Sequence, residues 1–395
     1  MIDNQVILNK VKEYNDYIIN TRHYLHENPE LSLEEFKTSE FLQEEVRKRG
    51  LEVTMVTETG FYAVLDTGRP GKIIGMRTDI DALPIQEQDN NLAGKRLCKS
   101  KIDGVMHACG HDGHMAAMLG AVNILSDLKD SLSGKIVFIF EAAEEIGAGV
   151  KEMVAALKPL GISAIYGTHL ASFMETGTIC VDAGPRMAGS ALIDMNIIGR
   201  SGHGSRPDLS INPVFGAAQV LNALSVAWVN QLDVNKTVTL GITQIIGGTA
   251  NNVIPDKVYI SGSLRFFDVE AGQAALDVLK RVSEQTAAVH NCRVEFGPNT
   301  RMGTRPVIND DALAAKQIET VASLYPGKLV HDVKWYASES FNRYRDVAPS
   351  LFAFVGIANE KYGSGAEHHN DYFDLDDDAL QYSLGSTVLF ALNNL

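Results

Sequence analysis

Two near-continuous apolar runs, at 135–140 and 350–355, constrain the fold of this 395-residue chain more than any other feature. A strand with one face in solvent alternates apolar and polar residues, whereas these two runs do not alternate. They are typical of parallel strands that helices cover on both faces. A helical pattern at 114–125 precedes the first run and another at 150–157 follows it, so the sequence predicts an α/β domain.

Residues that can bind a metal ion or move a proton follow the ends of the predicted strands. In open α/β sheets the ligand crevice lies outside the carboxyl ends of the strands, so these segments should meet at one place. In chain order, the residues are Asp79, Asp81, Glu144, Glu145, His169, His368 and His369.

The stretch Met106–His114 adds a thiol, three imidazoles and a carboxylate within nine residues. Cys109 and His111 are two residues apart, which fits a tight loop that then enters a helix. Such a loop can turn a thiolate and an imidazole toward one cation. The alternative is a buried cysteine beside a helix whose histidines only cap or hydrogen-bond locally.

The candidate ligands exceed what a single tetrahedral zinc ion needs, which favours two ions a few ångströms apart. Each residue also has a plainer interpretation. His169 could be a hydrogen-bonded loop histidine, the pair at 368–369 could lie on the surface, and the two glutamates could start a solvated helix. The candidate ligands are Cys109, His111, Glu145, His169 and His369.

The two adjacent glutamates need different roles. If Glu145 binds metal, Glu144 points elsewhere and is free to take a proton from water whose pKa the metal has lowered. Asp79 and Asp81 could orient a ligating imidazole from behind, although ordinary loop acids are an equal alternative.

Residues 185–297 do not continue the strand–helix alternation of the first domain. They are predicted as strand, helix, two strands, helix and strand, the order of a ferredoxin-like α+β unit. We therefore predict a catalytic domain of residues 1–184 and 298–395, interrupted by an inserted domain. From their residues alone, the glycine-rich segments around His203 and Asn252 are predicted to be turns. Arg265 could bind a substrate carboxylate or pair with an acidic side chain.

The amino-terminal residues predict two helices. The first runs from about Gln5 to His26, and Asn28-Pro29 ends it. Ser32 to Glu35 has the pattern of a capping box that opens the second helix, and Gly50 closes it.

The formal net charge of −14 argues against a nucleic-acid or anionic-membrane partner, since either would need a basic patch. No apolar run approaches the roughly 20 residues of a membrane span. The first residues show no basic and apolar segments of a signal peptide. The four cysteines lie far apart, so we expect a reduced, cytoplasmic protein.

Taken together, the motifs closely resemble the amidohydrolase branch of the M20 metallopeptidases, which includes hippurate hydrolases, N-acyl-amino-acid amidohydrolases and indoleacetyl-amino-acid hydrolases. The resemblance spans nearly the whole chain. It is carried by Asp79-x-Asp81-Ala-Leu-Pro-Ile, His107-Ala-Cys-Gly-His-Asp-Gly-His114, Ala143-Glu-Glu145, Gly-Thr-His169, Gly202-His203-Gly-Ser-x-Pro207, Asn252-Val-Ile-Pro255 and His369-x-x-Tyr-Phe.

The resemblance implies a catalytic α/β domain with two divalent ions, zinc or manganese, and an inserted dimerisation domain that acts as a lid. It places the metal ligands on the five residues named above, and the general base on Glu144. His369 is preferred to His368 because its register fits the family pattern. His203 resembles the lid histidine that stabilises the oxyanion, and Asn252 a lid residue near the substrate. Glu141 stands where many relatives have glutamine, which would add negative charge near the site.

The sequence therefore predicts a metal-dependent amidohydrolase that cleaves N-acyl amino acids, hippurate-like or N-acetylated, and forms a homodimer through the inserted domain. A dipeptidase of the same superfamily is the nearest alternative. A metal-binding protein that has lost catalysis is a further one, although retention of Glu144 beside Glu145 speaks against it.

Overall fold

The structure is a computed structural model that describes residues 2–395. The chain forms two compact units, each described by itself. Unit 1 comprises residues 1–184, 308–333 and 343–395, and unit 2 comprises 185–307 and 334–342. Unit 2 thus holds the predicted insertion of 185–297 and, in addition, 298–307 and 334–342, which lie within the predicted catalytic domain.

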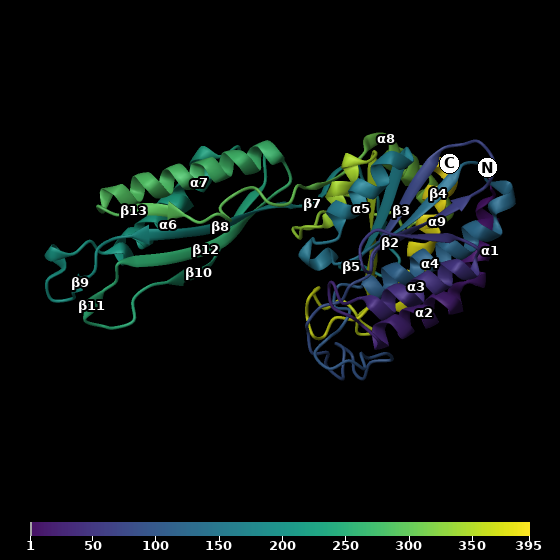
Figure 1. Cartoon of the computed structure of the whole chain (residues 1–395), viewed down its shortest axis with the longest axis horizontal. Helices are drawn as coiled ribbons and strands as arrows, with labels where there is room; N and C mark the ends of the chain where they lie inside the picture. Colours follow the sequence, from purple (N-terminus) through teal and green to yellow (C-terminus); the bar gives the residue numbers. More distant parts are fainter. Residues whose placement is uncertain (1) are drawn as a thin grey trace. The chain divides into compact units, whose positions relative to one another are not determined.

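Unit 1 is built on a seven-stranded mixed sheet with the strand order β1-β2-β4-β3-β5-β15-β6. Figure 1 shows the strands β2, β4, β3 and β5 of this sheet. Its four central strands are parallel, while β1, β2 and β6 run antiparallel to their neighbours. The strands are β1 (Glu52–Met55), β2 (Phe61–Asp66), β3 (Ile73–Asp79), β4 (Lys135–Glu141), β5 (Ala164–Glu175), β6 (Ile179–Cys180) and β15 (Ser350–Ala358).

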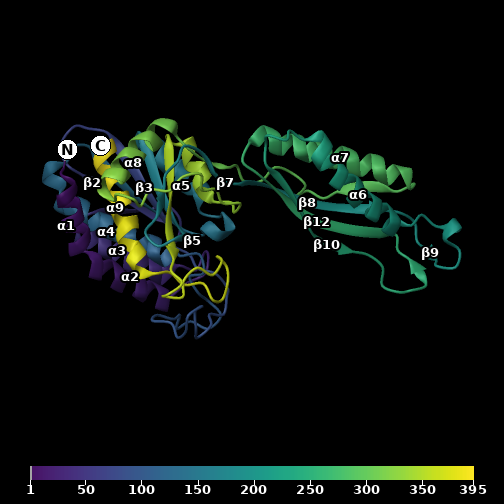
Figure 2. The same ribbon diagram turned by 180° about the vertical axis from the view of Figure 1, so that it is seen from behind.

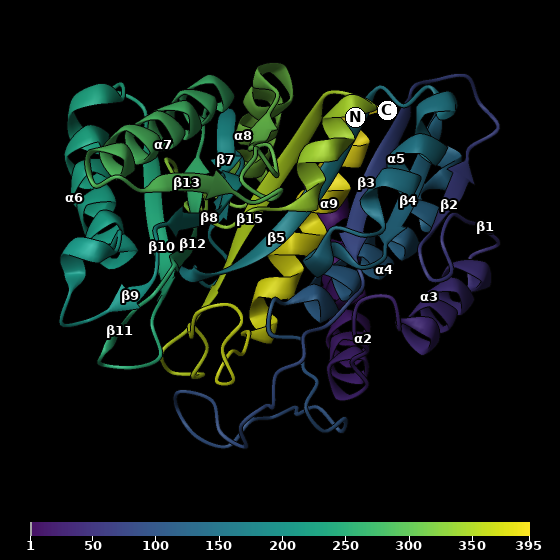
Figure 3. The same ribbon diagram turned by 60° about the vertical axis from the view of Figure 1, so that its left-hand side comes forward.

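Both apolar runs form central strands, as predicted. All residues of β4 after Lys135 are buried, and so are all residues of β15 before Ala358. Helices α4 and α9 lie against the central strands, and α2 packs on α4 (Figure 3). The helices of unit 1 are α1 (Asn4–Glu13), α2 (Asn15–Glu27), α3 (Phe36–Lys48), α4 (His111–Asp127), α5 (Val150–Leu157), α8 (Asp311–Leu324) and α9 (Leu380–Asn394).

The amino-terminal helices differ from the prediction in two ways. The first predicted helix is divided at Tyr14 into α1 and α2. The predicted capping box is wrong, because α3 begins only at Phe36 and its N-cap residue, Glu35, makes no side-chain cap hydrogen bond. The end of α3 is as expected, since Gly50 adopts the left-handed conformation with φ of 74°.

Unit 2 has the predicted ferredoxin-like order of elements and an antiparallel sheet with the order β10-β12-β8-β13. Helices α6 and α7 pack together on one face of this sheet (Figure 2). The elements are β8 (Gly189–Ile198), α6 (Pro213–Gln231), β10 (Val238–Ile246), β12 (Lys257–Phe266), α7 (Val269–Val289) and β13 (Arg293–Phe296). The chain passes from unit 1 to unit 2 at β7 (Gly184–Met187) and returns at β14 (Val307–Asn309), and residues 334–342 make a second, short excursion into unit 2.

Two short strands of unit 2, β9 (Gly202–His203) and β11 (Val253–Ile254), pair with each other in an antiparallel ladder. None of the helices described between Ile2 and Leu395 has the length and apolar character that crossing a lipid bilayer requires. The cytoplasmic location stays a prediction.

Candidate metal centre and active site

The register of the parallel strands explains why distant acidic and imidazole residues meet. Asp79 at the end of β3 pairs with Glu141 at the end of β4. On the other side of β3, Arg77 pairs with Gly167 of β5, so two further residues bring Asp79 level with His169. His169 itself lies within β5, which continues to Glu175, so the prediction that this strand ends before His169 is wrong.

The backbone conformation of Gly110 brings the Cys109 loop to the same edge of the sheet. Gly110 adopts the left-handed conformation with φ of 85°, and α4 begins at the next residue, His111, three residues earlier than expected. Cys109 and His111 therefore lie on either side of a sharp turn, and both are almost fully buried. The Sγ of Cys109 lies 3.6 Å from the Nε2 of His169.

The remaining candidates come from two loops. Glu144 and Glu145 lie in a short 3₁₀ helix, η2 (Glu144–Ile146), directly after β4. The Oε2 of Glu145 lies 3.3 Å from the Nε2 of His369, and its Oε1 lies 3.8 Å from the Nε2 of His111. His369 has a positive φ of 61°, and its backbone N–H donates to Ala108, which ties its loop to the Cys109 loop.

The structure thus brings all five predicted ligands into overlapping clusters. In each cluster, one ligand atom of every member lies within 4.8 Å of the others. Three clusters contain the predicted ligands together: Cys109 with His111 and His169, Cys109 with Glu145 and His369, and His111 with Glu144 and Glu145. A fourth joins Asp79, His111 and His114. His368, the alternative to His369, instead accepts a hydrogen bond from the backbone N–H of Ser172.

The donor set fits divalent ions. Two ligand atoms bound tetrahedrally at 2.0–2.3 Å lie about 3.3–3.6 Å apart, which matches the Cys109–His169 and Glu145–His369 separations. Among residues 2–395, the buried Nε2 of His111 and Oε1 of Glu145 have no hydrogen-bond partner, which is costly unless another group binds them.

Burial and neighbouring charges act on these side chains in different directions. Burial lowers the pKa of His169 well below its usual value, so this imidazole is neutral and able to bind a cation. Burial and the nearby Glu145 raise the pKa of the Cys109 thiol, and a bound cation would act in the opposite sense. Burial alone would lower the pKa of His111, but Asp79 and Asp81 raise it well above its usual value.

Asp81 contacts His111, whereas Asp79 is hydrogen-bonded to His114 and also lies near His111. The Nδ1–H of His111 donates to the backbone carbonyl of Asp81 at 2.9 Å and lies 3.3 Å from its carboxylate, so Nε2 faces the cluster. Asp79 accepts a hydrogen bond from the Nδ1–H of His114 at 2.7 Å and lies 3.7 Å from His111. These contacts are those of groups that orient ligands, although the role itself stays a prediction.

The sequence alone predicts no role for His114. Its Nε2 accepts a hydrogen bond from the backbone N–H of Leu170, the residue after His169, while its Nδ1–H binds Asp79. Because both ring nitrogens are used, His114 positions the neighbouring strand and is not available to a metal. Its place one helical turn after His111 is the signal that could have suggested a supporting role.

Glu141 does not act as its sequence position suggested. Its carboxylate is buried and accepts hydrogen bonds from Arg77 and from the hydroxyl of Tyr344, each at 2.7 Å. Arg77 also donates to Asp79 at 2.8 Å. The charge of Glu141 is therefore paired inside the domain instead of facing a substrate.

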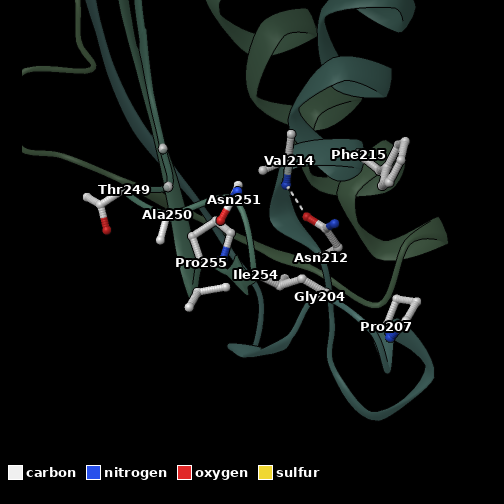
Figure 4. Close-up of a pocket in the computed structure, with 13 residues that line it drawn as sticks. Gly204, Pro207, Asn212, Val214, Phe215, Thr249, Ala250, Asn251, Ile254 and Pro255 are labelled. Atoms are coloured by element: carbon white, nitrogen blue, oxygen red, sulfur yellow. Dashed lines mark hydrogen bonds between the residues drawn. The ribbon is translucent and has the colours of Figure 1, made fainter.

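The predicted lid residues lie in unit 2. Val253 pairs with His203 in the small β9–β11 sheet, and the Gly204 N–H donates to the carbonyl of Asn252, so His203 and Asn252 lie close together. An open cavity of about 750 Å³ lies beside them, lined by loops that include Pro207, Asn212 and Asn251 (Figure 4). Figure 4 also shows Asn212 capping α6 through the N–H of Val214.

Arg265 lies in β12, where it is partly buried and donates a hydrogen bond to Ser338 at 2.6 Å. Burial lowers the pKa of its guanidinium. Within the described chain, residues 2–395, no carboxylate forms an ion pair with it. The alternative that Arg265 serves a structural ion pair is thereby disfavoured.

Comparison with known proteins agrees with this geometry. The family described as Peptidase family M20/M25/M40 matches residues 75–389. This chain belongs to the M20 peptidase family. It is therefore a hydrolase that acts on amide bonds, and its family is metal-dependent. The α/β fold with an inserted α+β domain, predicted from the sequence, is confirmed.

Individual relatives cover most of the chain. An "N-acyl-L-amino acid amidohydrolase" from Geobacillus stearothermophilus is 39% identical over 303 residues, which cover 76% of this chain and 80% of the relative. "Thermostable carboxypeptidase 2" from Saccharolobus solfataricus is 34% identical, with 97% of each chain covered. A crystal structure of a dinuclear metal-binding M20 peptidase from Bacillus subtilis has a TM-score of 0.81 at 32% identity, covering 97% of this chain and all of that one.

Proposed function

We propose that the protein hydrolyses the amide bond of N-acylated amino acids, either hippurate-like or N-acetylated, and releases a carboxylate and a free amino acid. The observation that carries this proposal is the placement of Glu144 and Glu145 in one short helix beside the thiolate and imidazole cluster. The similarity to a relative named for N-acyl-amino-acid hydrolysis supports the substrate class.

Cys109, His111, Glu145, His169 and His369 would hold two divalent ions, zinc or manganese. Thiolate, imidazole and carboxylate donors suit zinc, while the carboxylate and imidazole donors also suit manganese. Such ions, when bound, supply the Lewis acidity that polarises the scissile carbonyl and lowers the pKa of the attacking water.

Glu144 acts as the general base. One of its carboxylate oxygens lies within 4.8 Å of ligand atoms of His111 and Glu145, within reach of a water held there. As the water oxygen bonds to the carbonyl carbon, Glu144 takes the proton. It then delivers that proton to the amide nitrogen as the carbon–nitrogen bond breaks, so the amine leaves neutral.

Three residues of unit 2 would act on the substrate. His203 donates a hydrogen bond to the oxyanion, a role that requires it to be brought to the scissile carbonyl by domain closure or by a partner subunit. Arg265 binds the carboxylate of the amino acid, which its freedom from protein carboxylates favours. Asn252 contacts the substrate beside His203. The two residues stay close together because the Gly204 N–H donates a hydrogen bond to the carbonyl of Asn252.

The inserted domain is also the proposed dimer interface. Its edge strand β10 carries no charged residue, and neither does α6, which exposes Val226 and Val229. An uncharged, unpaired edge strand is a surface that pairs readily with another chain. Sedimentation of the wild-type protein and of a Val229→Glu variant tests this, with a dimer expected only for the former.

A second candidate function is cleavage of a peptide with a free carboxyl terminus, because a carboxypeptidase is 34% identical over nearly the whole chain. A panel of N-acetyl, N-benzoyl and indoleacetyl amino acids, run beside free dipeptides with zinc-loaded and manganese-loaded enzyme, separates the two. Higher kcat/KM on the dipeptides would favour the peptidase.

The variant Glu144→Gln tests the mechanism. It keeps the shape of the side chain but cannot take a proton, so kcat should fall by at least about 10²-fold while both metals stay bound. Metal analysis together with steady-state kinetics measures both quantities. Normal turnover in this variant would show that Glu144 is not the base.

A further inference from the structure

Glu35 is a buried carboxylate that is distant in the sequence from the residues of the proposed chemistry. Its side chain has no exposed surface, whereas its neighbours Glu34 and Phe36 are exposed. Burying a carboxylate is costly unless hydrogen bonds compensate the lost water. The hydroxyl of Thr59 donates to its Oε2 at 2.9 Å, and the backbone N–H of Ala143 donates to its Oε1 at 2.8 Å.

The contact with Ala143 matters because of the conformation of that residue. Ala143 adopts the left-handed region, with φ of 54° and ψ of 44°, which costs a residue with a Cβ roughly 1–2 kcal/mol. It directly precedes Glu144 and Glu145, so its dihedral angles set the direction in which both carboxylates leave the backbone. A strained residue persists only where its surroundings hold it.

The same short segment also contacts the other side of this turn. The hydroxyl of Ser32 donates to Oδ2 of Asp81 at 2.7 Å, and this oxygen also accepts the backbone N–H of Glu145 at 3.1 Å. Residues 32–35 therefore hold the turn at two points, directly through Glu35 and indirectly through Asp81. This arrangement replaces the capping box that the sequence suggested.

We propose that Glu35 is a positioning residue that holds Ala143 in its left-handed conformation and thereby aims Glu144 at the reacting centre. The proposal rests on the role of Glu144 as general base. Glu35 acts through geometry, because an oxygen at the Oε1 position accepts the Ala143 N–H whether the side chain is a carboxylate, a carboxylic acid or an amide.

Three variants of the metal-loaded enzyme test the proposal. Glu35→Ala removes the acceptor, Glu35→Gln keeps it, and Glu34→Ala is the matched control on the exposed neighbour. The measurements are bound metal, kcat and KM on the best N-acyl amino acid, and hydrogen–deuterium exchange of the peptide that contains 143–148.

Glu35→Ala should lower kcat by about 10–100-fold, the scale for a displaced catalytic group, with KM within about threefold and both metals retained. Amide exchange in 143–148 should become faster. Glu35→Gln should recover most of the lost kcat and the slow exchange, and Glu34→Ala should match the wild type.

Unchanged kcat and exchange in Glu35→Ala would overturn the proposal. So would a Glu35→Gln variant as impaired as Glu35→Ala, because the negative charge and not the acceptor geometry would then be essential. If metal is lost in step with kcat, Glu35 serves metal retention and the proposal is also wrong. Should Glu35→Ala fail to fold, Thr59→Val frees the other oxygen of Glu35, and it should speed exchange in 143–148; unchanged exchange there refutes the proposal.

The exchange measurement separates this proposal from the proposed function. If the wild-type enzyme hydrolyses no substrate of the panel, the proposed function fails. The effect of Glu35 on the 143–148 turn can still be read from amide exchange in that case.

Discussion

Replacing Asp81 by asparagine should weaken metal binding without unfolding the protein. Asp81 is fully buried, and one carboxylate oxygen accepts both the Ser32 hydroxyl and the Glu145 N–H. The other lies 3.3 Å from Nδ1 of His111. An amide of the same shape must turn its NH₂ group toward one side, so it loses either a hydrogen bond accepted by the first oxygen or the charge attraction between the second oxygen and His111.

The size of the effect follows from that loss. A hydrogen bond to a charged group contributes about 1.5–3 kcal/mol, and about 1.4 kcal/mol corresponds to a factor of ten. Metal affinity should therefore fall about 10–100-fold, which agrees with the usual effect of removing a group that orients a ligand. Because the carbonyl of Asp81 still accepts from His111, the ring orientation should be loosened and not lost.

The assay is competition with a chelator of known affinity, using zinc or manganese at fixed pH. The exposed Asp103 provides a matched control, and Asp103→Asn should bind metal like the wild type. Circular dichroism and thermal unfolding of the metal-free proteins report whether the fold is intact. An unchanged affinity in a folded Asp81→Asn variant would refute the reasoning, since the backbone carbonyl alone would then suffice to orient His111.

Three further outcomes are expected. Cys109→Ser should weaken metal affinity at least about tenfold because a hydroxyl replaces a soft thiolate, whereas the serine variant of Cys98 should keep metal; equal affinities in a chelator titration would contradict the thiolate assignment. His203→Ala should lower kcat by roughly 10²–10³-fold with both metals bound. Near-native turnover would show that His203 is only a residue of a turn and does not stabilise the oxyanion. Buried His26 has its pKa raised from 6.5 to about 9, since Asp112 and Glu87 outweigh burial, so its stabilisation is full below about pH 6.5 and is lost as the pH rises through about 9. His26→Gln should therefore lower the free energy of unfolding in urea more at about pH 6 than at about pH 10, and an equal loss at both would refute this.

The sequence was sufficient to predict those parts of the protein that depend on local patterns. Apolar runs without alternation predicted the central strands β4 and β15, because burial on both faces leaves no solvent-facing positions to carry polar residues. The ends of successive strands predicted that Glu145, His169 and the Cys109 loop would meet. This inference depends only on the general rule for where ligands bind in α/β sheets, and it succeeded although β5 continues past His169.

The tertiary structure alone decided which side chains support the site. Glu35 binds Ala143 across 108 residues, and Tyr344 binds Glu141 across 203. From the local sequence, Glu35 looks like part of a capping box and Glu141 like a charged strand end. Both are buried in the structure, and their hydrogen-bond partners come from distant segments. Periodicity reports which face of an element is buried, but it does not specify which hydrogen bond a buried polar group will form. For that reason the ligand candidates could be named from the sequence, while the residues that hold them in position could not.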